Sequence, residues 1–105
     1  MLVKVTADGR VTLEDRENFR AFKLLIEGSP TKIDAARRAL TGTAEVPDQS
    51  YAWISEAALR QWPEVAQDTT WQKNLGNMIE KARPHGWVDD SRKAIRAHIE
   101  WTEPT

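Results

Sequence analysis

The segment from Thr69 to Trp87, TTWQKNLGNMIEKARPHGW, carries the clearest structural signal in the chain. Apolar side chains recur in it at the spacing of one helical face, and the positions between them are polar. Thr69 and Gln72, three residues apart, predict a capping box at the start of this helix. Gly86, after a basic last turn and a proline, ends it. The rest of the chain is expected to pack on an apolar stripe formed by Trp71, Leu75, Met78, Ile79 and Ala82.

The length and composition predict one globular domain that spans residues 1–105. Fifteen basic residues against sixteen acidic ones give a net charge of −1, which argues against a general electrostatic attraction to nucleic acid or anionic lipid. The absence of cysteine excludes disulfides and thiolate chemistry. No stretch approaches the ~20 apolar residues of a membrane span, and the amino terminus lacks a secretory pattern. We therefore expect a cytoplasmic location and no membrane partner.

Both ends of the chain carry strand patterns. Leu2–Thr6 and Arg10–Leu13 alternate apolar and polar residues around an Asp-Gly turn, which predicts a β-hairpin. Near the other end, the apolar residues of Ala94–Trp101 recur with period two, which predicts a strand rather than a helix.

The segment after the hairpin fits two kinds of element. Phe19–Glu27 has apolar residues at spacings that suit a helix and a strand equally well. The break at Gly28 and the capping residue Ser29 favour a strand over Ala21–Glu27, followed by a helix over Thr31–Leu40.

The middle of the chain completes the expected fold. Thr43–Gln49 reads as a loop, Ser50–Ile54 as a short strand, and Ser55 as the cap of a short helix that runs to about Gln61. The prediction is an α+β domain with a single-layer sheet of about five short strands, which include the amino-terminal hairpin and the carboxy-terminal strand. About three helices pack against this sheet.

The turn after the predicted Trp71–Ala82 helix holds the candidate catalytic residues. A histidine near a carboxylate, as in His85 and Asp89, is the type of pair that exchanges protons with a substrate. His98 joins them only if the last strand folds back over the end of the helix. The structural alternative is that His85 satisfies the last helical carbonyls while Asp89 and Asp90 cap a turn.

Other catalytic and cofactor motifs are absent from the sequence. Two histidines without cysteine, and without a pair at helical spacing, do not predict a metal site. The chain contains neither a Gly-x-Ser-x-Gly elbow nor a glycine-rich phosphate loop. We expect no cofactor, and the sequence leaves open whether the protein is an enzyme.

Tryptophan is unusually frequent, with five Trp against one Tyr and two Phe. Each indole needs area and a partner for its N–H, so a small domain is expected to bury two or three of them. One or two others are expected to be partly exposed, and Trp62, next to a proline, and Trp101, near the chain end, are predicted to be these. With Trp87 they form the predicted partner or ligand surface.

Two further features invite an explanation. Arg92, Lys93 and Arg96 form a basic cluster beside acidic residues, which favours a solvated face with local ion pairs over a phosphate site. Gly76 lies inside the predicted helix at a cost of ~1 kcal/mol relative to alanine, which suggests a close approach to a strand or a subunit.

Two functional hypotheses follow from the sequence. The first is a non-enzymatic interaction domain or accessory subunit, which acts by association with a protein partner or as a homo-oligomer. The alternative is a small ligand-binding protein or enzyme, whose tryptophan-lined pocket holds His85, His98 and a carboxylate. Nucleic-acid binding is a third, less favoured hypothesis.

Overall fold

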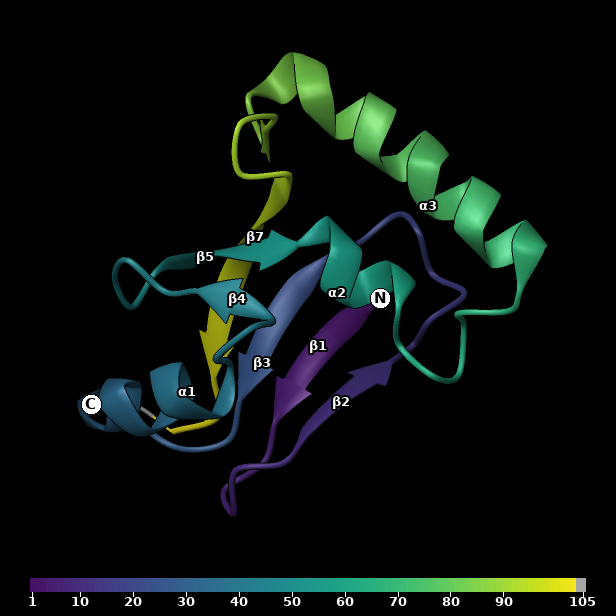
Figure 1. Cartoon of the computed structure of the whole chain (residues 1–105). Helices are drawn as coiled ribbons and strands as arrows, with labels where there is room; N and C mark the ends of the chain where they lie inside the picture. The colour runs from purple at the N-terminus through teal and green to yellow at the C-terminus, as the bar shows by residue number, and fades with distance from the viewer. Residues whose placement is uncertain (104–105) are drawn as a thin grey trace.

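The last strand of the chain, β7 (Ala94–Trp101), is the central strand of a mixed sheet in the computed structural model, which describes residues 1–103 (Figure 1). On one edge, its residues 94–98 pair antiparallel with β5 (Tyr51–Ser55). On the other edge, residues 98–101 pair parallel with β3 (Lys23–Ile26). The strand predicted over Ala94–Trp101 is confirmed, with the strand order β2-β1-β3-β7-β5-β4 around it.

The amino-terminal hairpin is also confirmed. It consists of β1 (Leu2–Val5) and β2 (Val11–Glu14), joined by a turn in which Gly9 has a φ of +87°. This positive φ is readily adopted by glycine, as the Asp-Gly signal predicted. On its other edge, β1 pairs parallel with β3, so the ambiguous segment before Gly28 is a strand.

Three α-helices pack on one face of this sheet. They are α1 (Ile33–Ala39), which follows a 3₁₀ turn over Pro30–Lys32, then α2 (Glu56–Arg60) and α3 (Thr69–Ala82), which leads into a 3₁₀ turn over Arg83–His85. In Figure 1, α1 and α2 lie in front of the strands. Within residues 1–103, no helix is long and apolar enough to cross a membrane.

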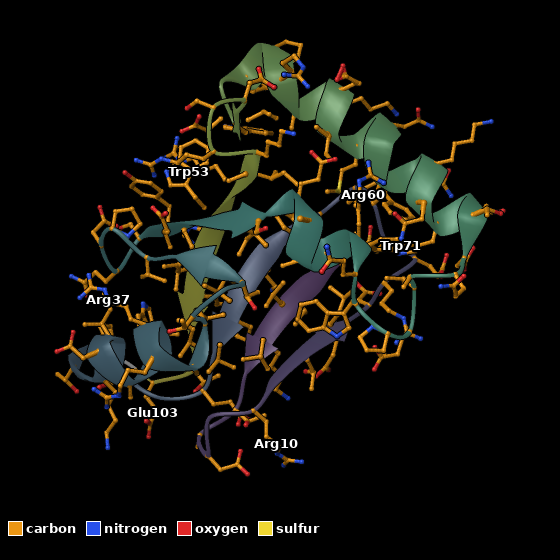
Figure 2. The ribbon with its side chains drawn as sticks, in the orientation of Figure 1. Arg10, Arg37, Trp53, Arg60, Trp71 and Glu103 are labelled. Atoms are coloured by element: carbon orange, nitrogen blue, oxygen red, sulfur yellow. The ribbon has the colours of Figure 1, made fainter. Side chains whose placement is uncertain are left out.

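A single hydrophobic core joins the helices to the sheet. Trp71 of α3 is buried in it, and its Nε1–H donates to the carbonyl of Arg16 at 3.0 Å (Figure 2). Phe19 packs on the same indole with ring centroids 5.9 Å apart. The core therefore draws on each helix and on one face of the sheet, with contributions from Ala36, Leu40, Leu59, Leu75, Leu24, Ile54, Ile95 and Ile99.

The α+β class is correct, but the sheet has more strands than predicted. Two of its strands are only two residues long: β4 (Ala44–Glu45), inside the predicted loop, and β6 (Val88–Asp89), inside the turn after α3. They pair with β5 and β7, respectively. A two-residue strand is too short to show the alternation from which strands are predicted, so the estimate of about five strands was low.

The predicted capping box at the start of α3 is wrong. Asp68 is the N-cap, and its carboxylate accepts a hydrogen bond from the backbone N–H of Trp71 at 3.0 Å. The Gln72 side chain is occupied elsewhere, because its Nε2 donates to the carbonyls of Arg60 and Val65, both at 3.0 Å. Its Oε1 accepts from Arg60, which lies between α2 and α3 (Figure 2). Gln72 thus joins the two helices.

Gly76 does not mark a close approach to a strand within residues 1–103. A Cβ atom at this position would lie 3.6 Å from the Arg60 guanidinium, which is an ordinary van der Waals separation. Packing within the described residues therefore does not require a glycine here.

Replacement of Gln72 by alanine should weaken the α2–α3 contact. The substitution leaves partly buried carbonyls of Arg60 and Val65 without this donor, which we expect to cost about 1–3 kcal/mol of unfolding free energy. Lys73→Ala, at the neighbouring exposed position, is the control and should stay within about 0.5 kcal/mol. Urea denaturation measures both, and equal midpoints for the two variants would contradict the assignment.

Gly76→Ala should stabilise the protein. Alanine has the higher helix propensity and the space for its methyl group is present, so a gain of roughly 0.5–1 kcal/mol is expected. Gly9→Ala is the opposing control, because a φ of +87° is strained for alanine. A loss of stability in Gly76→Ala would show that a subunit or another element approaches this position.

Candidate functional site

The face of the sheet opposite the helices carries aromatic and basic side chains. Alternation along β5 and β7 places Tyr51 opposite His98 and Trp53 opposite Arg96 on this face. The Arg96 guanidinium lies over the Tyr51 ring, 4.6 Å from its centroid, and Trp53 packs edge-on to Tyr51 at 6.4 Å. We call this surface the open face. Within residues 1–103, the three helices leave it uncovered.

Trp87 stands at the border of the open face and the end of α3. Gly86, with a φ of +76°, turns the chain back toward the sheet, so that the carbonyl of Trp87 accepts the N–H of Arg96 at 2.7 Å. The indole stacks on His85 with centroids 4.4 Å apart and planes 20° apart. Trp87 is 45% exposed, more than any other large hydrophobic side chain in residues 1–103. Its backbone is fixed while its ring faces solvent.

Two adjoining hollows flank this indole, and we call them together the Trp87 groove. Both are lined by Phe22, Trp87 and Arg96. The first, of about 340 Å³, extends toward α3 and includes Lys81 and His85. The second, of about 380 Å³, extends over the open face; its other lining residues are Ser50, Tyr51 and His98. The groove therefore combines aromatic walls with cationic side chains.

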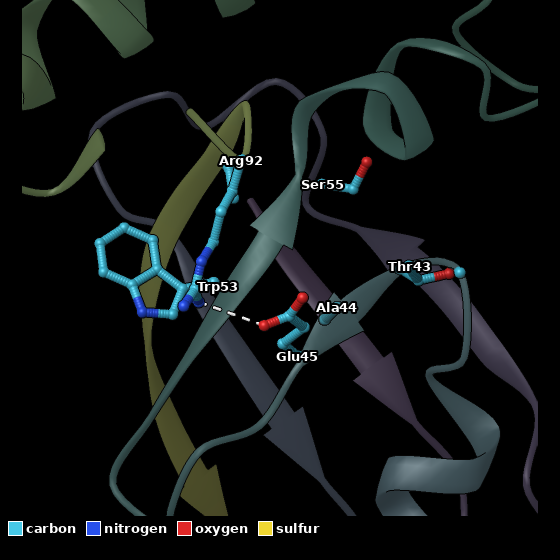
Figure 3. A pocket seen from close by; sticks show the side chains of 8 residues that line it. Thr43, Ala44, Glu45, Trp53, Ser55 and Arg92 are labelled. Atoms are coloured by element: carbon cyan, nitrogen blue, oxygen red, sulfur yellow. Dashed lines mark hydrogen bonds and ion pairs between the residues drawn. The ribbon is translucent and has the colours of Figure 1, made fainter. Parts of the chain in front are cut away.

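A third hollow lies beside Trp53. Figure 3 shows the Arg92 side chain passing the indole to reach Glu45, with an ion-pair distance of 3.1 Å. The hollow has a volume of about 210 Å³. Arg92 also pairs with Asp89 at 3.3 Å. The charges at this hollow are already paired with one another. Fewer charged groups are therefore free to bind a ligand here than in the Trp87 groove.

The three candidate catalytic residues do not converge. His85 and His98 line different hollows of the Trp87 groove. Asp89 instead caps a turn, where it accepts hydrogen bonds from the Ser91 hydroxyl at 2.8 Å and from the backbone N–H of Arg92 at 3.2 Å. These bonds hold the pKa of Asp89 below its usual range. Within residues 1–103, no three His, Asp or Glu side chains are grouped as metal ligands.

The tryptophans match the predicted exposure only in part. Trp71 alone is fully buried within residues 1–103, whereas two or three such indoles were expected. Trp62 and Trp101, predicted to be partly exposed, are half-buried and pack against the core, which confirms that part of the prediction. The Trp101 Nε1–H donates to the carbonyl of Gln49 at 2.9 Å, which holds the indole against the neighbouring loop. Trp87 is thus the exposed member of the predicted surface.

Sequence reasoning did not bring together the residues that line the groove. Tyr51 lay in the short strand predicted over Ser50–Ile54 and Arg96 in a basic cluster, but no local pattern linked them. Their contact arises from the register of β5 against β7. Phe22 lay in the Phe19–Glu27 segment, which fitted both a helix and a strand. Its position depends on the path of the chain just before β3 begins at Lys23.

Comparison of the chain with protein-family models, curated proteins and solved structures finds no match. Its function is therefore inferred from its own geometry.

Removal of the Ser91 hydroxyl should raise the pKa of Asp89. Ser91→Ala deletes the largest cause of the lowered pKa, so the carboxyl should titrate closer to the ordinary value of about 3.9. The depressed pKa means that ionised Asp89 stabilises the fold above the unfolded-state pKa, and this contribution is lost as the pH falls through the folded-state pKa. In Ser91→Ala this contribution should be smaller, and its loss should be complete at a higher pH.

Carboxyl ¹³C NMR titration from about pH 6 to pH 2 measures this shift directly. Ser29→Ala, which removes a hydroxyl beside α1, is the control and should leave Asp89 unchanged. An identical Asp89 titration in wild type and Ser91→Ala would show that the turn does not depend on this hydrogen bond.

Proposed function

We propose that this domain is a non-enzymatic association module, and that it binds a protein partner through the open face around Trp87. The observation that carries the proposal is the exposure of Trp87 at an aromatic groove, on a sheet face that the helices leave uncovered. Tryptophan and arginine are enriched among the residues that dominate binding energy at protein interfaces. A fixed backbone under an exposed indole also lowers the entropy lost on binding.

The surroundings of the histidines favour contact over proton transfer. One face of the His85 ring is stacked on Trp87. Asp89 is engaged by Ser91 and Arg92 and does not line the Trp87 groove. A catalytic histidine is normally oriented by a hydrogen-bonded carboxylate or carbonyl, and no carboxylate lines the Trp87 groove beside His85 or His98 in the described part of the chain.

One observation favours a second candidate, a small-molecule site. His85 and His98 line two hollows of the same groove, and volumes of about 340 and 380 Å³ fall within the range of ligand pockets. Mass spectrometry of protein purified from its native cells distinguishes the candidates, because it identifies proteins that remain bound and small molecules released on denaturation.

Trp87→Ala should remove the association. The variant deletes the exposed indole but retains the backbone hydrogen bond to Arg96, so we expect an unchanged fold and at least a tenfold loss of partner binding. Lys73→Ala, on the exposed side of α3, is the matched control and should bind like wild type. Quantitative affinity capture from native cells compares the three proteins, and analytical ultracentrifugation over a range of concentrations tests self-association.

The proposal fails in either of two ways. One is a wild-type protein that stays monomeric and retains no partner. The other is a partner that binds wild type and Trp87→Ala equally well, which would place the interface elsewhere.

A further inference from the structure

The charges at the Trp87 groove are of one sign. Arg20, Lys81 and Arg96 line it, and none of its lining residues is acidic. Within residues 1–103, these three side chains form no ion pair with a carboxylate, whereas Lys23 and Arg92 nearby on the open face both do. The groove therefore holds three cationic groups that have no ion-pair partner within residues 1–103; Glu17 lines an adjoining hollow with Arg20 and Lys81 but forms an ion pair with neither cation.

The acidic residues near the groove on the open face are already paired. Glu100 is 2.6 Å from Lys23, which holds the pKa of Glu100 below its usual range. Glu45 and Asp89 both pair with Arg92, at 3.1 and 3.3 Å. Because each of these carboxylates already has a cationic partner, they reduce the positive potential at the groove only weakly.

The size and floor of the groove indicate what fits between these cations. Apolar atoms of Phe22, Met78, Ala82 and Ile95 line the hollow next to α3. Its volume of about 340 Å³ lies near the lower end of the ~300–1,000 Å³ found for small-molecule pockets. A space of this size fits one large apolar side chain with charged neighbours better than it fits an extended cofactor.

We propose that the Trp87 groove binds an acidic linear segment of the partner protein. One aromatic or large aliphatic side chain of the segment occupies the hollow, and flanking carboxylates meet Arg20, Lys81 and Arg96. The contact with Tyr51 holds the Arg96 guanidinium in place before the partner arrives, which lowers the entropy lost on binding. This inference rests on the proposed function and names the chemistry of the partner.

The same groove suits single-stranded nucleic acid less well. Such binding requires aromatic ring faces that are free for base stacking and a cationic track along the backbone. Here His85 covers one face of Trp87, and Arg96 covers one face of Tyr51. The three unpaired cations surround a hollow rather than a track.

Synthetic peptides test the inference on the full chain. The probe is a capped hexapeptide with one phenylalanine and five aspartate or glutamate residues. Its control peptides carry lysine at the acidic positions, or serine in place of phenylalanine. We expect ¹H–¹⁵N shifts at Trp87 and Arg96 with the acidic peptide, about tenfold weaker binding of the serine peptide, and no saturable binding of the lysine peptide.

Matched charge variants locate the site. Lys81→Gln should weaken the acidic peptide about fivefold and reduce its salt dependence, because Lys81 lines the groove. Lys73→Gln, eight residues earlier on the same helix and outside the groove, should leave binding unchanged. Arg96→Gln should weaken binding at least as much as Lys81→Gln, since Arg96 lines both hollows.

Three results would overturn the inference. They are equal binding of the acidic and lysine peptides, equal effects of Lys81→Gln and Lys73→Gln, and tighter binding of a mixed single-stranded RNA than of the acidic peptide at the same salt. The proposed function is tested separately. If Trp87→Ala loses the native partner while the acidic peptide does not bind, the association role stands and the acidic partner is wrong.

Discussion

The structure depends on the register of β7, which pairs with β3 on one edge and β5 on the other. Leu24 lies opposite Ile99, so the first quarter of the chain meets its last strand across the centre of the sheet. Contacts between such distant segments require closure of long loops, which slows folding relative to local contacts. The sheet, and with it the surface on which α3 packs, is complete only when the last strand is in place. α3, the helix with the clearest sequence signal, therefore packs on a sheet whose central strand is β7.

The same register determines what the open face presents. Side chains alternate along a strand, so a shift of one residue in β7 would exchange Ile95, Ala97 and Ile99 with Arg96 and His98. Such an exchange would bury charge in the core, which makes it strongly unfavourable. The hydrophobic core thus fixes the position of Arg96 over Tyr51. The backbone bond from Arg96 to Trp87 extends this constraint to the turn after α3, so the groove is held in shape by the forces that stabilise the fold.

Local patterns predicted the parts of the fold that local forces determine. The hairpin around Gly9 and the strand Ala94–Trp101 follow from alternation and turn chemistry, and both were correct. The N-cap of α3 was misplaced because Gln72, which the capping box required, bonds instead to α2 and the loop after it. The exposure of each tryptophan also depends on distant residues, as the bond from Trp101 to Gln49 shows. The sequence predicted a candidate site at the turn that contains His85 and Trp87. The register of β5 against β7, which the sequence did not predict, places Tyr51 and Arg96 next to it.

The formal charge of −1 describes the whole chain and not the groove. At physiological ionic strength, exposed charges are screened over about 8 Å, so a site responds mainly to its nearest charges. Carboxylates that are already paired, such as Glu100 with Lys23, act at longer range as weak dipoles. Arg20, Lys81 and Arg96 lack such partners within residues 1–103 and line a single groove. A balanced composition therefore argues against diffuse binding to a polyanion, yet it is compatible with a small cationic site shaped for one acidic segment.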